Sequence, residues 1–382
     1  MPAVLFLFTI TNLVIGTGAF VLSGMLHDVA RSLGVSVSVA GQAVTAYALA
    51  AAFVAPLLLV LTGALARKPA MLVALAAFTI GNLLSALASS MTLLLIGRVL
   101  MGASGSMFTA VSAGVVVALV APERRGRALA LAFLGMSMSY AVGVPFGAWL
   151  GMNHGWQVPI WLVTGACVLV MAVLAFALPR EIHAPRATFA GLGMVMRQWD
   201  ILRILLRTLL YFTAIFSVMA YAGPVMLALN PLTPGELSLM LMMFGFSGVA
   251  GSMFSGWVVD RIGALRAARR QLILLAGMML LVPLTSGHPV VTIIVFVAWG
   301  IAGFGLSTSQ QVMLTTRMLS QAPLVLSLNT SMLYVGSALG AAISGTFASL
   351  VGLDKLSWVG LPFALLGLLT LWSRKPARPK VS

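Results

Sequence analysis

The run VVTIIVFVAWGIAGFGLSTSQQVML, residues 290–314, carries no Asp, Glu, Lys or Arg and is long enough to cross a bilayer as a helix. Similar apolar runs make up most of the chain: of its 382 residues, 61% are hydrophobic and only 8% are charged. The mean hydropathy is +1.09. One water-soluble core could not bury this much apolar surface, because too few polar residues remain to cover it. The sequence therefore predicts an integral membrane protein whose outer surface contacts the lipid bilayer.

The apolar runs predict an all-α integral membrane fold with twelve transmembrane helices. Each run has about the 20 residues that a helix needs to cross the hydrocarbon layer. The predicted spans cover residues 3–27, 37–63, 70–89, 92–119, 126–151, 156–178, 203–229, 235–259, 268–287, 290–314, 322–350 and 356–373. The first run lacks the basic flank and cleavage site of a signal peptide, so we expect it to remain as a span.

The basic residues predict the orientation of the chain. All Lys and Arg residues except Arg31, Lys355 and Arg98 fall in loops and tails on one side of this scheme. Because basic loops stay in the cytoplasm, both termini are predicted to be cytoplasmic in a multi-pass protein of the bacterial cytoplasmic (inner) membrane. The net charge is +15, but the charges are spread over separate short loops without interleaved aromatic residues. We therefore expect no nucleic-acid partner.

A repeat of two halves is predicted around the longest hydrophilic interval, which runs from about Pro179 to Gln198. At one fixed offset between the halves, Gly143 aligns with Gly336 and Gly147 with Gly340. This pattern indicates a parallel repeat of six spans. The predicted domains are an N-terminal six-helix bundle at 1–179, a cytoplasmic linker at 180–199, a C-terminal six-helix bundle at 200–374 and a basic cytoplasmic tail at 375–382.

Glycines four residues apart mark two of the spans. The fifth reads GVPFGAWLG from Gly143 to Gly151, and its counterpart reads GSALGAAISG from Gly336 to Gly345. This spacing makes a stripe without side chains that lets another helix approach closely, and Pro145 removes one backbone donor and favours a bend. The stripes serve either helix packing alone or a seam between two halves that rock.

A further motif, GWVVDRIG, lies in the loop after the eighth span. Its adjacent Asp and Arg can cap neighbouring helix ends and pair across a closed cytoplasmic face. The residues predicted to take part in gating are Gly256, Asp260, Arg261, Gly263, Gly143, Pro145, Gly147, Gly336 and Gly340.

These motifs resemble those of the major facilitator superfamily. GWVVDRIG resembles its inter-span loop motif, GVPFGAWLG the fifth-span motif of its drug:proton antiporters, and IGRVLMG around Arg98 its fourth-span basic motif. GTGAF at 16–20, LGVSVSVAGQAVTAYAL at 33–49, PERRGRALAL at 122–131 and NTSMLYVGSALG at 329–340 are similar to the arabinose-efflux and purine-nucleoside-efflux branch. The resemblance implies two bundles that rock about a central site, export of a small solute, exchange for protons and action as a monomer.

The sequence departs from this branch in its acidic residues. Branch members carry an acid in the first span where this chain has Ala19, and Arg67 stands where the first loop motif has Asp. All seven acidic residues fall at span ends or in loops, so no carboxylate is predicted at the middle of the membrane. A buried carboxylate is the usual group for exchanging protons with a solute. Proton coupling must then use Asp28 or His27 at the outer mouth or another route, or the protein is a proton-independent facilitator.

The resemblance implies a role for Arg98 in closure or proton movement. No acidic residue is near Arg98 in the sequence, so we expect backbone carbonyls or amides as its partners.

The expected solute is small and neutral or weakly polar, such as a sugar, a nucleoside or a drug, because uncharged side chains dominate the spans. Soft and aromatic side chains suit such a solute. The candidates for lining its cavity are Asn12, Thr17, Phe20, Gln42, Thr45, Tyr47, Ser104, Phe108, Tyr140, Tyr211, Tyr221, Gln310, Gln311, Asn329 and Tyr334. Two glutamines and an asparagine at span depth need polar partners, which a water-lined cavity would supply.

A rival interpretation is an intramembrane serine protease, because GASG at 102–105 matches a nucleophile pattern around Ser104. That chemistry needs a histidine at membrane depth, and all four histidines map to span ends or loops. The chain has one cysteine, Cys167, and no HExxH or nucleotide-binding motif. We therefore expect no metal, no cofactor and no enzymatic activity.

Overall fold

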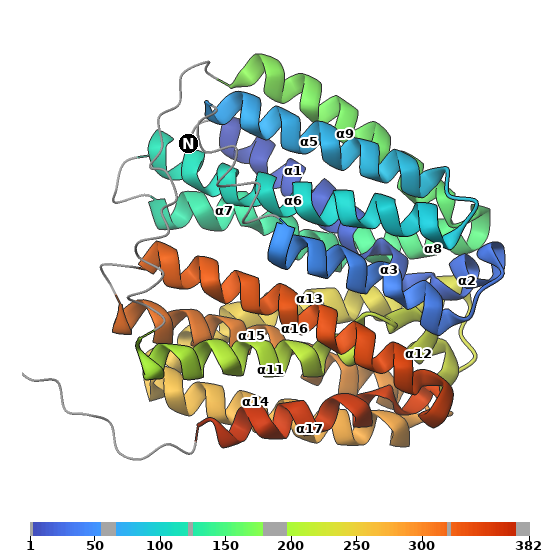
Figure 1. Cartoon of the computed structure of the whole chain (residues 1–382). Coiled ribbons are helices and arrows are strands. Elements are labelled where there is room, and N and C mark those ends of the chain that lie inside the picture. Colours follow the sequence, from blue (N-terminus) through green and yellow to red (C-terminus); the bar gives the residue numbers. More distant parts are fainter. Residues whose placement is uncertain (1–2, 55–65, 121–124, 179–196, 319–321, 372–382) are drawn as a thin grey trace, which may run out of the picture.

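The described part of the chain is helical throughout, as predicted. The structure is a computed structural model that describes residues 3–54, 66–120, 125–178, 197–318 and 322–371, and no strand occurs among them (Figure 1). The helices run roughly parallel to one another in two bundles. We call the end at which α1 begins the Ala3 end and the opposite end the His27 end, which lie at the left and right of Figure 1.

The upper bundle in Figure 1 is built by the first half of the chain. Two of its helices continue into π-helical segments, η2 and η4. Its elements are α1 (Ala3–Phe20), η1 (Val21–Gly24), α2 (Leu26–Leu33), α3 (Val37–Leu49), η2 (Ala50–Val54), α5 (Arg67–Ala86), α6 (Met91–Leu119), α7 (Arg125–Met138), η4 (Ser139–Gly143), α8 (Val144–His154) and α9 (Gln157–Ala177).

The lower bundle is built by the second half. Its elements are α11 (Trp199–Met219), α12 (Ala222–Leu229), α13 (Pro234–Ile262), α14 (Ala264–Leu281), η5 (Val282–Thr285), α15 (Pro289–Arg317), α16 (Ala322–Val351), η7 (Leu353–Lys355) and α17 (Leu356–Leu369). Most of the predicted linker and all of the predicted basic tail lie outside the described residues, so those domain boundaries stay predictions.

The packing of the two bundles repeats, which confirms the pseudo-repeat. In the first bundle α1 packs on α7 and η4, α5 on α6 and α9, and α3 on α6. The second bundle repeats these contacts in the same order: α11 packs on α16, α14 packs on α15 and α17, and α13 packs on α15. Between the bundles, α3 lies along α16, and α8 with η4 lies along α13.

Eleven helices of the described residues are long and apolar enough to cross a membrane. The predicted twelfth span corresponds to α17, which has 14 residues. The seventh span, predicted at 203–229, corresponds to α11 and α12, and α11 begins earlier, at Trp199. Its chain then breaks at Tyr221 before α12, as the first span breaks at Met25 before α2.

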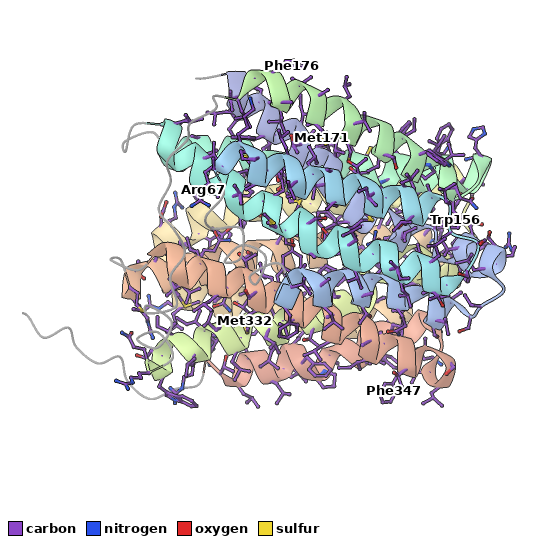
Figure 2. The ribbon with its side chains drawn as sticks, turned by 45° about the horizontal axis from the view of Figure 1, so that its top comes forward. Arg67, Trp156, Met171, Phe176, Met332 and Phe347 are labelled. Atoms are coloured by element: carbon purple, nitrogen blue, oxygen red, sulfur yellow. The ribbon has the colours of Figure 1, made fainter. Side chains whose placement is uncertain are left out.

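The outer surface of the bundles is apolar, as contact with lipid requires. Phe176 of α9 is 91% exposed, and Figure 2 shows it and Phe347 of α16 projecting from opposite sides of the molecule. Exposed tryptophans lie near both ends of the helices, Trp199 and Trp257 toward the Ala3 end and Trp149 and Trp358 toward the His27 end. Such belts of tryptophan mark the two interfaces of a membrane.

Most of the stripe glycines pack within their own bundle, among them Gly143, Gly147, Gly336 and Gly340, whereas Gly345 lies against Gln42 and Ser38 of the other bundle. A side-chain atom added at Gly143 would overlap Thr17 of α1, and one added at Gly147 would overlap Val21 of η1. An atom added at Gly340 would lie 2.5 Å from the carbonyl oxygen of Thr213 in α11. The spacing predicted a close approach correctly, but it did not identify the partner helix.

Pro145 follows the π-helical segment η4 rather than producing a simple bend. A proline nitrogen cannot donate to the carbonyl four residues earlier, which is that of Ala141 in η4. The wider π-turn takes up this irregularity while the helix continues from α7 into α8.

We expect Gly147→Leu to destabilise the first bundle, because the new side chain must displace Val21 and separate α8 from η1. Overpacking of this kind costs about 1–3 kcal/mol. Thermal unfolding of the purified protein in detergent measures the loss as a lower midpoint. Gly165→Leu in α9 is the matched control, since an atom added there meets nothing within 4 Å. Equal midpoints for the two variants would contradict this packing.

Candidate functional site

An aromatic cluster fills the middle of the interface between the bundles. The ring of Phe20 stacks on Tyr140 at 4.7 Å between centroids and lies 6.0 Å from Phe216 of the second bundle. Tyr140 in turn meets Phe304 of α15 edge-on at 5.6 Å. We call the group of Phe20, Tyr47, Tyr140, Phe212, Phe216, Phe304 and Tyr334 the central aromatic cluster.

The rings of the cluster come from both bundles. Each lies at a break in a helix or near the middle of a helix. Phe20 ends α1 and Tyr140 lies in the π-turn η4. Tyr334, midway along α16, packs against the apolar core of the first bundle and is an electrostatic neighbour of Tyr47 and Tyr140. Four of the predicted cavity residues, Phe20, Tyr47, Tyr140 and Tyr334, are therefore brought together here.

The polar groups of this region are uncharged and incompletely paired. Tyr47 is 2% exposed, and its hydroxyl has no hydrogen-bond partner among the described residues. An unpaired buried hydroxyl is unfavourable, and a ligand that offers an acceptor or a donor removes that penalty. Rings that stack and a hydroxyl that lacks a partner suit a ring-shaped solute with polar substituents.

Arg98 lies beside the cluster and is held by backbone carbonyls, as the sequence suggested. Its Nε donates to the Ala43 carbonyl oxygen at 3.2 Å and Nη1 to that of Gly18 at 2.7 Å, while Nη2 donates to Ala19. The guanidinium also lies 4.8 Å from the centre of the Tyr47 ring. Carbonyl dipoles and a ring face thus replace the carboxylate that a buried arginine usually requires.

A second buried arginine was missed from the sequence. Arg207 of α11 is 3% exposed, whereas we expected it in a cytoplasmic loop. Its Nε donates to the hydroxyl of Thr370 at 2.8 Å and Nη1 to Oε1 of Gln310 at 3.3 Å. It therefore joins α11, α15 and the end of α17 inside the second bundle.

Several predicted cavity residues lie inside the first bundle instead. The Asn12 amide donates to the carbonyl of Ala132 at 2.9 Å, Thr17 donates to its own helix, and Phe108 is fully buried. Ser104 donates to the carbonyl of Leu100, and no hydrogen bond joins it to a histidine of the described residues. The protease interpretation has no catalytic pair in this structure.

Others lie inside the second bundle. Asn329 accepts from Thr208 at 2.7 Å, Gln310 accepts from Arg207, and Tyr211 packs edge-on against Phe212 at 4.9 Å. Side chains of neighbouring helices therefore bind the amide oxygens of Asn329 and Gln310, whereas the Gln310 amide nitrogen is buried without a hydrogen-bond partner. The third amide for which we expected a water-lined cavity, that of Gln311, is exposed and contacts Ser307 of its own helix.

Two predicted cavity residues, Gln42 and Tyr221, lie where α3 meets α16, toward the His27 end. The Gln42 amide of α3 lies beside Gly345 of α16. Thr45, farther along α3, has a buried hydroxyl without a hydrogen-bond partner. Tyr221 enters the contact from the break between α11 and α12. Gln42 and Tyr221 hold the bundles together on one side of the central aromatic cluster.

The acidic residues are all peripheral in the described part of the chain. Asp28, Asp200, Glu236, Asp260 and Asp354 each lie near a helix end. Glu123 and Glu181 lie outside the described residues. Asp28 pairs loosely with Arg31 at 3.8 Å, and the partial burial of His27 lowers its pKa below the usual value despite the adjacent carboxylate. His27 is thus neutral at pH 7.

The GWVVDRIG motif at the Ala3 end forms the last turns of α13 and ends at Gly263, rather than the loop that we expected. Its Asp and Arg are not engaged across the bundles. Asp260 is exposed and makes no ion pair within the described ranges, and Arg261 covers the ring of Trp257 at 3.9 Å. Gly263 links α13 to α14 with a φ of +82°, a conformation that favours glycine. Gly256 lies in open space.

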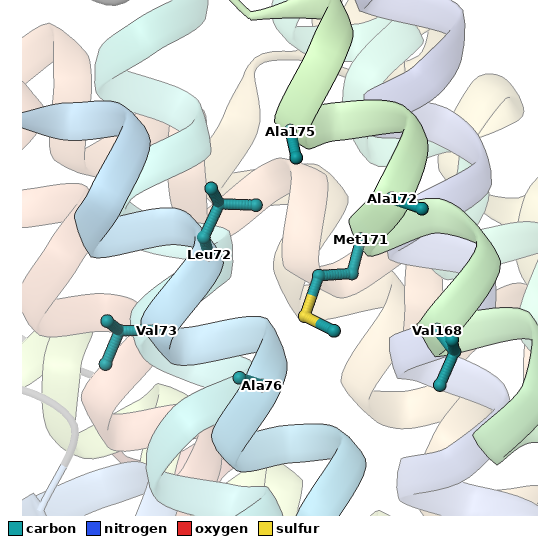
Figure 3. A pocket seen from close by; sticks show the side chains of 7 residues that line it. All are labelled: Leu72, Val73, Ala76, Val168, Met171, Ala172 and Ala175. Carbon is teal, nitrogen blue, oxygen red and sulfur yellow. The ribbon is translucent and has the colours of Figure 1, made fainter.

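Two grooves of the described surface lie away from this site. One has a volume of about 470 Å³ and runs between α5 and α9; Figure 3 shows that only apolar side chains line it, with Met171 between the two helices. The other, of about 220 Å³, lies between α1, α8 and α9. Neither includes a residue of the second bundle, so both face the lipid rather than the interface.

Sequence reasoning found Tyr334 but missed the other residues that the second bundle contributes to the cluster. Phe212 and Phe216 are one helical turn apart and stack at 5.8 Å, and Phe304 contacts Tyr140 of the first bundle. Aromatic spacing of i and i+4 on one predicted span was the available signal. It did not distinguish an interface from a bundle core.

Comparison with known proteins agrees with this architecture. The family model described as Major Facilitator Superfamily matches residues 8–341 and 232–382. The inner membrane transport protein YdhP of Escherichia coli (strain K12) is 31% identical over 96% of this chain and 94% of its own. A probable sugar efflux transporter of Helicobacter pylori (strain P12) is 26% identical over 96% and 93%.

Solved structures show the same fold. A bacterial homologue of the human lysosomal transporter Spinster, crystallised in an inward-facing and occupied conformation, superposes with a TM-score of 0.75 at 14% identity. The match covers 97% of this chain and 95% of that one. At this identity the likeness concerns the fold alone.

We expect Arg98→Lys to destabilise the protein although it keeps the charge. A single ammonium cannot occupy the fork that binds the carbonyls of Gly18, Ala19 and Ala43. A carbonyl left unpaired in the interior costs about 1–3 kcal/mol, so the thermal midpoint in detergent should fall. Arg266→Lys, at an exposed position, is the matched control and should leave the midpoint unchanged. Equal midpoints for both variants would show that the fork is not required.

Proposed function

Because this chain belongs to the major facilitator superfamily, we propose that it exports a small, neutral or weakly polar solute from the bacterial cytoplasm by alternating access. The solute class is a sugar, a nucleoside or an uncharged drug. In this proposal both termini are cytoplasmic, the Ala3 end faces the cytoplasm and the His27 end faces outward. The E. coli relative, named as an inner membrane transport protein, supports the same membrane for this chain.

The observation that carries the proposal is the uncharged central aromatic cluster shared by the two bundles. Phe20 and Tyr140 of the first bundle meet Phe216 and Phe304 of the second, so a solute held among them would contact both moving parts. Ring faces stack on the apolar faces of sugars, bases and aromatic drugs. Among the described residues no carboxylate lies near the middle of a span, so none is placed to bind a cationic solute in the cluster.

The position of the contacts supports an inward-facing state. Ser238 of α13 donates to the carbonyl of Pro145 at 2.9 Å, and Gly24 packs against Gly223, both toward the His27 end. The Asp260–Arg261 motif at the other end is exposed and unengaged across the bundles. In the proposed cycle this motif pairs when the Ala3 end closes and the His27 end opens.

A proton-independent facilitator is the second candidate, and the peripheral acids favour it. Ala19 occupies the first-span position where an acid is usual in similar transporters, and its carbonyl binds Arg98 instead. A permanently charged arginine does not release a proton near neutral pH. Exchange for protons would have to run through Asp28 or His27 near the outer mouth.

Accumulation of labelled pentose, nucleoside and phenicol compounds in an efflux-deficient host tests the proposal, with and without a protonophore. We expect lower accumulation of at least one compound in cells that express the protein. Recovery on adding the protonophore would establish proton-dependent export, and indifference would establish the facilitator. Unchanged accumulation of every compound would contradict export of this solute class.

Phe20→Ala should weaken solute binding in the same assay. Loss of one stacking partner costs about 0.5–1.5 kcal/mol, so KM should rise by up to about tenfold while the protein stays folded. Phe176→Ala, at a lipid-facing position that is 91% exposed, is the matched control. A KM that is equal in the two variants would place the solute elsewhere.

Asp260→Asn should slow turnover without lowering stability. The carboxylate makes no ion pair in the present state, so its loss removes nothing from this fold. It would remove a charge-assisted contact from the state in which the Ala3 end is closed. Transport rate and thermal midpoint are measured together, and a normal rate would show that the motif does not latch.

A further inference from the structure

One tyrosine connects the bundles at the His27 end. Tyr221 is fully buried at the break between α11 and α12. Its hydroxyl oxygen lies 3.2 Å from the carbonyl oxygen of Ala341 in its own bundle and 3.4 Å from that of Ser38 in the other. A tyrosine hydroxyl has a single proton, so the two carbonyls share one donor.

The ring of Tyr221 occupies a seat made by two glycines on facing helices. An atom added at Gly41 of α3 would overlap the end of this ring. An atom added at Gly345 of α16 would lie 2.5 Å from the Tyr221 hydroxyl and 2.6 Å from the Gln42 amide nitrogen. Any side chain at either glycine therefore competes with the tyrosine for the same space.

The backbone at Tyr221 is also the place where the second bundle changes direction. Tyr221 (φ −120°, ψ 28°) and Met25 (φ −131°, ψ 29°) break their spans with nearly equal dihedral angles. Beside these breaks, Gly223 packs so closely that an added atom would overlap the Gly24 carbonyl. Tyr221 thus lies beside the place where the two broken spans contact each other.

We propose that Tyr221 is the latch that holds the His27 end closed. Ser38 and Ala341 belong to different bundles, so the shared hydrogen bond breaks and the ring leaves its seat when the bundles part at this end. Tyr221 is a positioning residue: it sets how often the outer side opens and makes no contact with the solute. The inference rests on the proposed function, because opening of this end is one step of the transport cycle.

Distances between spin labels across the His27 end test the latch without any solute. Cys167 is the sole cysteine and is fully buried, so Cys167→Ala gives the background. Ser32→Cys in α2 and Lys355→Cys in η7 place one label on each bundle at exposed positions. Double electron–electron resonance in lipid nanodiscs then reports the ratio of long to short distances.

Tyr221→Phe should raise that ratio about fivefold, the effect of losing roughly one neutral hydrogen bond from the closed state. Gly41→Ala should raise it at least as much, because the methyl group displaces the ring. Gly277→Ala, where an added atom meets nothing within 4 Å, is the matched control and should leave the ratio unchanged.

A double-mutant cycle distinguishes displacement of the Tyr221 ring from a general disruption of the structure by Gly41→Ala. In a Tyr221→Ala background the ring is absent, so Gly41→Ala should add no further shift. A fully additive shift would overturn the seat, and an unchanged ratio in Tyr221→Phe would overturn the latch. If Gly41→Ala fails to fold, judged by its circular dichroism spectrum, Tyr221→Phe alone decides.

The outcomes for the latch and for export are distinguishable. A shifted ratio together with no exported compound would support the latch and contradict the proposed solute class. Export of a compound with a KM and rate that Tyr221→Phe leaves unchanged, and an unshifted ratio, would support export and overturn the latch.

Discussion

The bundle architecture depends on how a buried charge is satisfied where no water reaches it. Arg98 donates to the carbonyls of Gly18 and Ala19, close to the point where α1 changes into the 3-10 turn η1. Carbonyls at such a junction lose their regular α-helical donors, so they are available to a guanidinium. The same side chain reaches Ala43 of α3. One interaction therefore fixes α6 against the two helices that carry Phe20 and Tyr47.

The sequence was sufficient for the fold because the bilayer imposes a length and a polarity on every span. It also indicated carbonyl partners for Arg98, since no acid was close in the chain. Contacts within or between bundles were harder to predict. The spacing of Gly143 and Gly147 shows that a helix comes close, but α1 and α13 are equally compatible with it. Only the folded arrangement identifies α1.

Only part of the candidate site could be predicted, because the sequence does not show which helices contact one another. Polar and aromatic residues at span depth are visible in the sequence, and Phe20, Tyr47, Tyr140 and Tyr334 do meet. Gln310 and Asn329 looked equally suitable, yet their amide oxygens accept from Arg207 and Thr208 inside the second bundle. Arg207 itself was misplaced because charge marked it as a loop residue. A guanidinium with several side-chain partners can lie well inside a helix bundle.

The π-turn η4 has a consequence for how this site is constructed. A π-turn holds one more residue than an α-turn, so the helix faces before and after it are offset by about 100°. That offset lets one continuous helix direct Gly147 of α8 toward its own bundle while Tyr140 of η4 reaches Phe304 of the other. The number of residues between α7 and Pro145 is therefore as much a determinant of the site as their identity. A single-residue deletion there would rotate the tyrosine out of the interface while changing no side chain of the cluster.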